Sequence, residues 1–180
     1  MVKSRRAEYA DATREALLEA AEVSFAERGF AATSLDDVAA AARVTKGALY
    51  HHFENKQHLF EAVFLRLEDT VVVNTAAAAS SKRDPFNQAL AGFGGFLAMC
   101  EDDRFRRIVL EEGPAALGWK RWRELDEPYG ISLLRATLQY LVDAGAIKKT
   151  SIDMLARSLR NPSASLPLYV VITSSATGFA

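Results

Sequence analysis

Apolar side chains recur at helical spacing over residues 11–28, which predicts one amphipathic helix with a single buried stripe. Charged side chains occupy the other faces of this segment. The stripe consists of Leu17, Leu18, Ala21 and Phe25. Gly29 follows the last turn, where a glycine commonly closes a helix, and Phe30 behind it can fold back against the apolar stripe. We expect this helix to support the elements that follow it.

Residues 34–53 predict two short helices joined by a tight turn. The buried stripe of the first helix is Leu35, Val38, Ala39 and Ala42. Ser34 is a candidate N-cap for the first helix and Thr45 for the second, because a side-chain hydroxyl can accept a hydrogen bond from a backbone N–H. In the second helix, Leu49 and Phe53 are expected to face inward.

The opposite face of the second helix carries a cation, a glycine without a side chain, a phenol and an imidazole. It consists of Lys46, Gly47, Tyr50 and His51, at positions i, i+1, i+4 and i+5. Such a face suits a phosphate-lined groove, as in a helix-turn-helix whose second helix reads DNA. We expect His52 to pack partly against the domain.

A long fourth helix is predicted from Asn55, its candidate N-cap, to about residue 80. Its apolar stripe is Leu59, Phe60, Val63, Phe64 and Leu67. Lys56 lies in the first turn, where the helix dipole favours anions. This misfit suggests that Lys56 is placed for an external phosphate; the alternative is an incidental surface lysine. Residues 80–85 form the best boundary in the chain, because an aspartate and a proline there suit the start of another helix.

Helical periodicity resumes over residues 86–100, 105–117 and 119–145, with an interruption at residues 127–128 and a closing glycine at Gly145. Three glycines inside the first of these segments each cost about 1 kcal/mol relative to alanine. They are Gly92, Gly94 and Gly95. Such a group implies close packing, a kink or room for a ligand, and the sequence does not decide among the three.

Beyond residue 159 the helical pattern stops. Prolines interrupt residues 161–180, and the run LYVVIT has β-branched and aromatic character. We expect a non-helical tail. It arises either from an altered terminus, such as a reading-frame change, or from a natural short variant with a strand-like or swapped tail.

The composition is that of an ordinary globular protein, with 49% hydrophobic and 25% charged residues and a formal net charge of −1. No global basic field indicates nucleic acid, so any DNA binding depends on local placement. Residues 1–10 carry Lys3, Arg5 and Arg6, which predicts a flexible basic arm, or alternatively a frayed terminus. The single Cys100, with no signal peptide or membrane-length apolar run, fits a cytoplasmic protein.

No catalytic or cofactor motif is found: the sequence has no GxSxG, HExxH, phosphate-cradling glycine loop or CxxC. The histidines are not expected to bind a metal, because His51 and His52 point to different faces and His58 lies beyond a helix break. We therefore expect no enzyme activity, no metal and no cofactor.

The run TSLDDVAAAARVTKGALYHHFENKQHLFEAV, with EALLEAAEVSFAERGFAATS before it, resembles the DNA-binding domain of the TetR family of bacterial transcriptional regulators. The similarity spans about residues 11–67 and combines spacing, caps and aromatic positions. Residues 118–147 also resemble the ligand-domain helix of one TetR subgroup. The resemblance implies an all-α fold, in which a three-helix head is joined by a long fourth helix to a C-terminal helical ligand-binding and dimerisation domain.

The expected organisation has four parts. They are a flexible basic arm over residues 1–10, a helix-turn-helix DNA-binding domain over 11–57, a helical effector-binding and dimerisation domain over 58–160, and an atypical tail over 161–180. TetR relatives usually continue at the tail with two long helices that pair with a second subunit. This chain is expected to hold at most a fragment of the first.

Helical geometry and the resemblance agree on the expected DNA contacts. Lys46 could touch a phosphate or a guanine edge, Gly47 allows a close approach of the backbone, and Ala48 could meet a thymine methyl group. The full set is Thr33, Ser34, Thr45, Lys46, Gly47, Ala48, Tyr50, His51 and Lys56.

The second half of the chain is expected to sense a small molecule. It holds more large apolar side chains than a small bundle needs, so an apolar pocket is the functional interpretation and ordinary core packing the alternative. The candidate pocket residues are Phe93, Phe96, Met99, Phe105, Trp119, Trp122, Tyr129 and Tyr140. By resemblance, an effector bound there would shift the fourth helix and release the DNA.

The sequence thus predicts a homodimeric TetR-like regulator, a repressor that leaves a near-palindromic operator when an unidentified effector binds. One alternative is a helical enzyme or small-molecule carrier, which would need a polar cluster in the second half. Another is a non-specific DNA-coating protein, which would need a strongly basic chain. A third is a regulator that has lost its dimer contacts.

Overall fold

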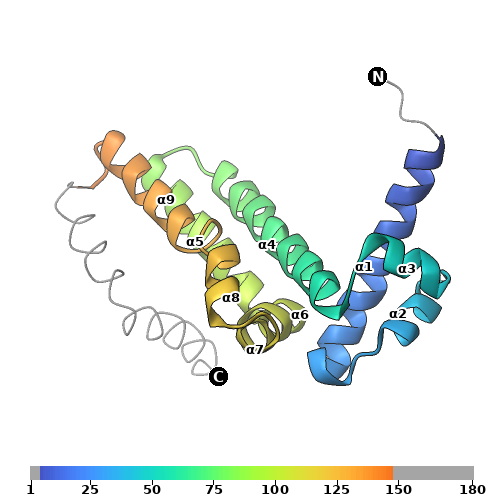
Figure 1. The fold of residues 1–180 in the computed structure, drawn as a ribbon. Helices are drawn as coiled ribbons and strands as arrows, with labels where there is room; N and C mark the ends of the chain where they lie inside the picture. Colours follow the sequence, from blue (N-terminus) through green and yellow to red (C-terminus); the bar gives the residue numbers. More distant parts are fainter. Residues whose placement is uncertain (1–4, 148–180) are drawn as a thin grey trace. The chain divides into compact units, whose positions relative to one another are not determined.

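The computed structural model describes residues 5–147, and every regular element in that range is helical (Figure 1). The elements are α1 (Arg5–Ala32), α2 (Leu35–Ala41), α3 (Lys46–His52), α4 (Lys56–Ser80), α5 (Pro85–Glu101), α6 (Asp103–Phe105), the π-helix η1 (Arg106–Glu112), α7 (Gly113–Leu117), α8 (Trp119–Asp126) and α9 (Ile131–Asp143). The predicted all-α fold with its two short helices and long fourth helix is confirmed. The tail expected over residues 161–180 lies outside the described residues.

The start of α1 corrects one prediction. The flexible arm expected over residues 1–10 is wrong for residues 5–10, because α1 begins at Arg5. The side chains of Arg5, Ala7, Glu8 and Tyr9 are exposed, so no apolar stripe marks these turns in the sequence. Helix-favouring alanines and Glu8 in the first turn support the helix without one. Residues 1–4 lie outside the described range.

Contacts divide the chain into two compact units, which do not follow the predicted linear boundaries. Unit 1 joins Met1–Leu67 to Asp103–Arg123, and unit 2 joins Glu68–Asp102 to Glu124–Ala180. Helix α4 therefore contributes its first half to unit 1 and its second half to unit 2. Residues 103–123, expected in the effector domain, pack with the head.

The core of unit 1 is built from α1, α2, α3, the first half of α4 and residues 103–123. Its largest fully buried side chains include Leu17, Phe25, Val38, Leu49, Leu59, Phe60, Val63, Phe64, Phe105, Ile108 and Val109. Phe25 and Phe60 meet edge to face with ring centroids 5.0 Å apart, and Phe30 joins them at 6.1 and 5.2 Å. The predicted stripes of the first four helices are therefore core, except that Leu35 and Ala42 are half-buried.

Gly29 interrupts α1 as predicted, with φ 78° and ψ 170°. This backbone conformation is essentially limited to glycine, because a Cβ would clash with the chain. A Cβ at Gly29 would also lie 2.5 Å from a carboxylate oxygen of Glu112. The break lets Phe30 turn back onto Phe25, the packing that the sequence suggested.

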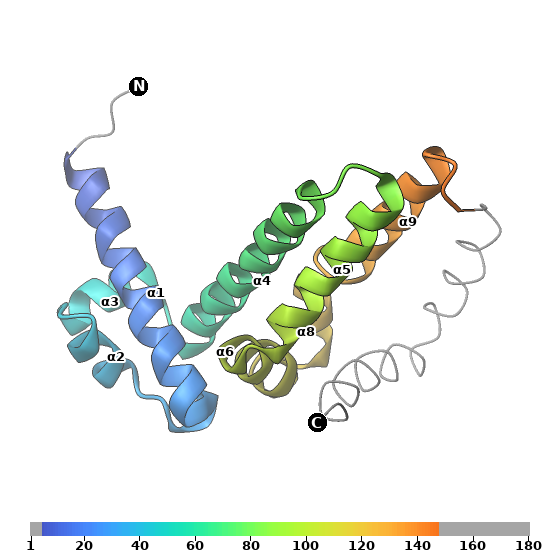
Figure 2. The same ribbon diagram turned by 180° about the vertical axis from the view of Figure 1, so that it is seen from behind.

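The three glycines of α5 separate into two kinds within unit 2, where α5 lies beside the second half of α4 and beside α9 (Figure 2). A Cβ at Gly92 would lie 3.3 Å from Thr75, and one at Gly95 would lie 3.1 Å from the Ala78 Cβ. A Cβ at Gly94 would meet nothing within 4 Å. Close packing against α4 is thus the reason for two of the glycines.

The remaining predicted breaks are confirmed. Asp84 caps α5 by accepting a hydrogen bond from the backbone of Asn87 at 2.9 Å, with Pro85 in the first position. Helices α8 and α9 are separated by a turn at residues 127–130. Gly145, at φ 70°, closes α9 with bonds from Gly145 N to Val142 O and from Ala146 N to Leu141 O, the Schellman pattern.

We expect opposite effects of alanine at neighbouring glycines of α5. Gly94→Ala should raise the free energy of unfolding by up to about 1 kcal/mol, because it improves helix propensity in open space. Gly95→Ala should lower it relative to Gly94→Ala, because its methyl group must push α5 away from Ala78. Urea denaturation monitored by circular dichroism measures both. A Gly95→Ala protein as stable as Gly94→Ala would contradict the close α4–α5 packing.

Candidate functional site

Helices α2 and α3 begin with the predicted hydroxyl caps. Ser34 Oγ accepts a hydrogen bond from Asp37 N at 3.2 Å, and Thr45 Oγ1 accepts one from Ala48 N at 3.1 Å. Both cap residues are exposed. A hydroxyl that accepts one bond still has a proton to donate, so each cap can also bond an outside oxygen.

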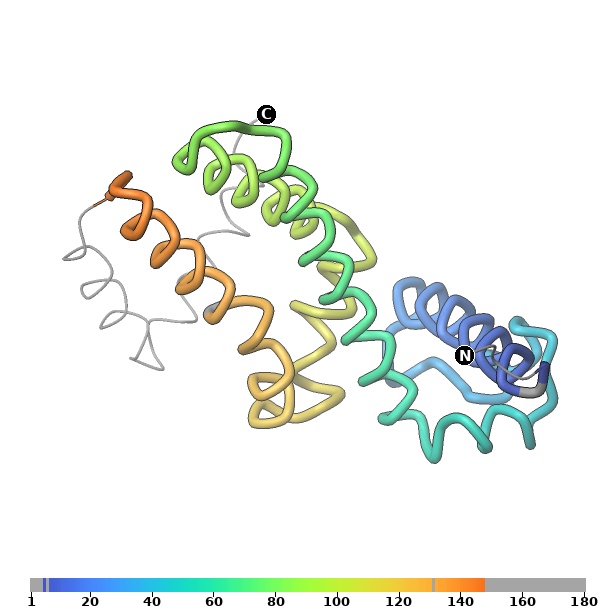
Figure 3. Tube along the Cα trace, turned by 90° about the horizontal axis from the view of Figure 1, so that it is seen from above, coloured from blue at the N-terminus to red at the C-terminus, as the bar shows by residue number. Residues whose placement is uncertain are grey.

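The turn between α2 and α3 is made by a strained residue. Arg43 adopts φ 56°, the only positive φ at a non-glycine position among the described residues. Its amide donates to Ala40 O at 3.1 Å, and Val44 N donates to Ala39 O at 3.0 Å. This turn places α2 and α3 together beside α1 in unit 1 (Figure 3).

Helix α3 turns the predicted face outward. Lys46, Gly47, Tyr50 and His51 are exposed, and Ala48 is half-buried. Leu49 and Phe53 face the core with 0% and 4% of their surface exposed. His52 is half-buried, as the sequence suggested, and its pKa is lowered by burial and by the nearby His51 and Arg14. The neutral imidazole therefore adds no charge to the outer face at pH 7.

Lys46 is tied to a residue that the sequence analysis did not single out. Its ammonium lies 2.8 and 3.0 Å from the two carboxylate oxygens of Asp36, in the first turn of α2. The hydrogen bond and the charge of Asp36 raise the pKa of Lys46. The sequence did show two acidic residues, Asp36 and Asp37, soon after Ser34. Their position is explained equally well by the helix dipole, which favours acidic side chains in the first turn.

Two of the expected DNA contacts have internal partners instead. Thr33 is 2% exposed, and its hydroxyl donates to Ser24 O or Gly29 O at 3.1 and 2.8 Å. The ammonium of Lys56 donates to Phe30 O, Ala31 O and Thr33 O at 2.8, 3.1 and 2.9 Å. An ammonium has only three protons, so the prediction of a phosphate contact by Lys56 is wrong in this structure.

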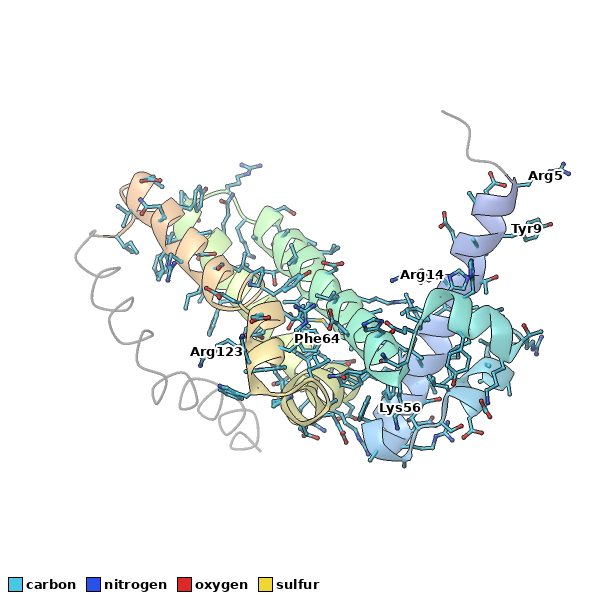
Figure 4. All side chains as sticks on the ribbon, viewed as in Figure 1. Arg5, Tyr9, Arg14, Lys56, Phe64 and Arg123 are labelled. Atoms are coloured by element: carbon cyan, nitrogen blue, oxygen red, sulfur yellow. The ribbon has the colours of Figure 1, made fainter. Side chains whose placement is uncertain are left out.

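Lys56 instead closes the end of α1, and Figure 4 shows its side chain at the start of α4. The ammonium also lies 4.7 Å from the Phe30 ring centroid. The apparent misfit with the α4 dipole is offset by these three carbonyl acceptors, which the sequence could not reveal. At the other end of α1, the exposed Arg5 and Tyr9 project away from the helix (Figure 4).

The eight candidate pocket residues are split between the units. Phe105, Trp119 and Trp122 belong to unit 1. Phe105 is 2% exposed, and the indole of Trp122 donates to Val109 O at 3.0 Å and packs against Gly113. These two side chains therefore belong to the core, which was the alternative to a role in a pocket. A groove of about 550 Å³ in unit 1 is lined instead by Ala26 and by charged residues of α1, α6 and η1.

The other five candidates lie in unit 2. Phe93 and Phe96 stack with centroids 6.4 Å apart on α5, and Met99 is half-buried on the same helix. Tyr129 donates to Asp69 at 2.9 Å, and Tyr140 donates to Gln88 at 2.7 Å. Unit 2 therefore keeps these five as candidates for effector contact.

Unit 2 also buries an acidic pair that the sequence analysis missed. Glu68 is 3% exposed and Asp126 is 6% exposed. Burial, followed by the charge of Asp126, raises the pKa of Glu68 far above its usual range, and one Glu68 oxygen has no hydrogen-bond partner. A signal was present, because Glu68 follows Leu67 and lies four residues after Phe64, within the apolar stripe of α4.

Two kinds of feature are absent from residues 5–147. No group of three or more histidine, cysteine, aspartate or glutamate side chains lies close enough to hold a metal ion. None of the helices in this range combines the length and hydropathy that crossing a bilayer requires.

Comparison with known proteins agrees with this geometry. The family model "Bacterial regulatory proteins, tetR family" matches residues 17–63, and "Tetracyclin repressor-like, C-terminal domain" matches residues 86–171. The chain is 28% identical over 160 residues to the transposon Tn10 TetC protein of Escherichia coli, covering 87% of this chain and 79% of that protein.

Two further relatives show the extent of the similarity. The probable acrEF/envCD operon repressor of Escherichia coli K12 is 42% identical over 89 residues, which cover 49% of this chain and 40% of the repressor. A solved TetR-family transcriptional regulator from Pectobacterium atrosepticum has a TM-score of 0.71 and 28% identity, over 95% of this chain and 86% of that one. The similarity thus ranges from 42% identity over about half of the chain to 28% identity over nearly all of it.

We expect Leu49→Ala to lower the free energy of unfolding by about 2–5 kcal/mol, because it leaves a cavity under α3. Tyr50→Ala, one residue along and on the exposed face, should change it by about 0.5 kcal/mol or less. Thermal melts of both variants test the orientation of α3. Equal losses of stability would mean that the helix is turned the other way.

We also expect Glu68→Gln to stabilise the protein at alkaline pH. A folded-state pKa above the unfolded value of 4.5 means that the unfolded chain loses the proton first, so the ionisable Glu68 lowers stability increasingly as pH rises above about 4.5. Glutamine cannot ionise, so the gain should be larger at pH 8 than at pH 5 in urea titrations. The exposed Glu101→Gln serves as the control, and a gain independent of pH would contradict the assignment.

Proposed function

The chain belongs to the TetR family of bacterial transcriptional regulators, and from this premise we propose that α3 enters the major groove of an operator and reads it. The chain is a DNA-binding regulator of transcription, and relatives that bear the name of repressor favour repression as its action. The observation that carries the proposal is the exposed face of α3, set on a buried Leu49 and Phe53.

Each residue of that face has a role that its chemistry supports. Lys46 would bind a phosphate or the acceptors of a guanine edge, and the Tyr50 hydroxyl and the His51 imidazole would reach phosphate oxygens. Gly47 admits the DNA backbone closely, because a side chain there would stand between α3 and the groove wall. Ser34, Thr45 and Ala48 complete the set at the starts of α2 and α3.

We propose that the regulator acts as a homodimer in the cytoplasm. One copy of so small a reading face buries little DNA, whereas two copies related by a two-fold axis place two reading helices about 34 Å apart, one turn of DNA. The matching operator would be near-palindromic. Assembly through the C-terminal half, as the resemblance implies, falls largely on residues outside the described range.

We further propose that a small-molecule effector releases the DNA by binding in unit 2. The half-buried and exposed aromatic side chains of α5 and α9 and the buried carboxyl groups of Glu68 and Asp126 support a site of mixed apolar and polar character there. Release requires the effector to bind more tightly to the conformation that does not fit DNA.

We expect Lys46→Ala and Tyr50→Phe to weaken binding to duplex DNA from upstream of the protein's own gene, measured by fluorescence anisotropy over a salt series against scrambled DNA. Lys46→Ala should also reduce the slope of log affinity against log salt by about 1, because one phosphate contact is lost.

Lys82→Ala is the matched control, because Lys82 is exposed and lies in unit 2. It should leave affinity and slope unchanged. If neither Lys46→Ala nor Tyr50→Phe weakens binding, the assignment of the reading face fails. If the wild-type chain does not prefer the upstream DNA to scrambled DNA, sequence-specific binding itself fails.

A further inference from the structure

The reading face carries an anion as well as a cation. Asp36, on α2, holds the ammonium of Lys46 between its two carboxylate oxygens at 2.8 and 3.0 Å. Both side chains lie on the surface, with 63% and 61% of their areas exposed. The cation best placed on α3 to meet DNA is therefore already paired with a carboxylate when the protein is free.

This pair is weak enough to exchange. An exposed ion pair contributes little to stability, because water screens both charges. A carboxylate and a phosphate offer the same kind of anionic oxygen acceptor to an ammonium. Phosphate can therefore replace Asp36 as the partner of Lys46, but only where the DNA comes close enough to compete.

The neighbouring acidic residue, Asp37, has a different ion-pair partner from Asp36. Asp37, next to Asp36 in the first turn of α2, has its carboxylate 3.1 Å from Arg28 of α1, and its backbone N–H donates to the Ser34 cap. Asp37 thus braces α2 against α1, whereas Asp36 spans from α2 to the reading helix. The two acids carry the same charge on the same turn but have different partners.

We propose that Asp36 is a specificity-determining residue that masks Lys46 from non-specific DNA. The proposal rests on the proposed function, in which Lys46 contacts DNA. Non-specific binding is almost entirely electrostatic and loosely docked, so the Lys46–Asp36 pair stays formed and the DNA meets a neutral pair. In the closely docked operator complex, Lys46 leaves Asp36 for a fixed phosphate or base edge, and short-range contacts offset the loss.

The Lys46–Asp36 pair should therefore weaken mainly the binding of non-specific DNA. Asp36→Asn should raise affinity for a random-sequence duplex by roughly three- to tenfold at low salt and steepen the log–log salt slope by about 0.9, the contribution of one additional phosphate contact. Affinity for the upstream duplex of the protein's own gene should rise less. The ratio of specific to non-specific affinity should fall accordingly.

Two controls separate masking from a general change of charge. Asp37→Asn changes the net charge equally on the same turn, so it should raise non-specific affinity and slope less than Asp36→Asn. Lys46→Ala should reduce non-specific binding little in the wild-type chain but strongly in the Asp36→Asn background, because only there is the lysine unmasked. Circular dichroism verifies that all variants are folded.

Results other than these would contradict the masking by Asp36, its role in specificity or the proposed function, and the three cases can be told apart. Equal effects of Asp36→Asn and Asp37→Asn, or equal effects of Lys46→Ala in both backgrounds, would overturn the mask and leave the proposed function standing. An unchanged ratio of specific to non-specific affinity would overturn the role in specificity. A wild-type chain that binds neither duplex would overturn the proposed function together with the mask.

Discussion

The turn that Gly29 makes near the end of α1 is the constraint on which unit 1 depends. Gly29 breaks the helix in a conformation that other residues do not adopt, and only the four residues 30–33 then separate it from Ser34, the N-cap of α2. The backbone groups of this turn would be costly if buried without partners. Side chains from distant parts of the chain provide those partners, so the position of α2 and α3 follows from them.

Those partners come from two later elements. Lys56 of α4 binds three carbonyl oxygens of the turn, and Glu112 of η1 accepts a hydrogen bond from Phe30 N at 3.2 Å. Ion pairs connect the same elements to α1: Arg104 of α6 lies 3.2 Å from Glu22, and Arg66 of α4 pairs with Glu15. Residues 103–123 are thereby part of the head, although the 35 residues 68–102 separate them from the first half of α4.

The local features of the fold could be predicted from the sequence because they depend on neighbours in the chain. The caps at Ser34, Thr45 and Asp84 and the break at Gly29 need only short-range chemistry, and the inward side of α3 follows from periodicity. Long-range partners could not be predicted. A hydroxyl such as Thr33 reads as available for DNA until the fold places it against carbonyl oxygens of α1.

The same distinction explains the split of the candidate pocket. Aromatic content alone cannot separate Trp122, whose indole bonds Val109 O in unit 1, from Phe93, which is exposed in unit 2. Nor does composition show that Glu68 is buried, because glutamate is rarely buried fully; only its position within the apolar stripe of α4 indicated it. Both outcomes depend on which helices meet, and that is set by packing over the whole unit.

Lys56 has a consequence for how much variation its position tolerates. Three carbonyl oxygens converge on one small tetrahedral ammonium, a geometry that a planar guanidinium or an amide cannot reproduce. A half-exposed, charged position of this kind would ordinarily accept many residue types over evolution. Here few other side chains can satisfy the same three carbonyl oxygens, so this position is as demanding as one in the hydrophobic core, although its exposure alone would not show it.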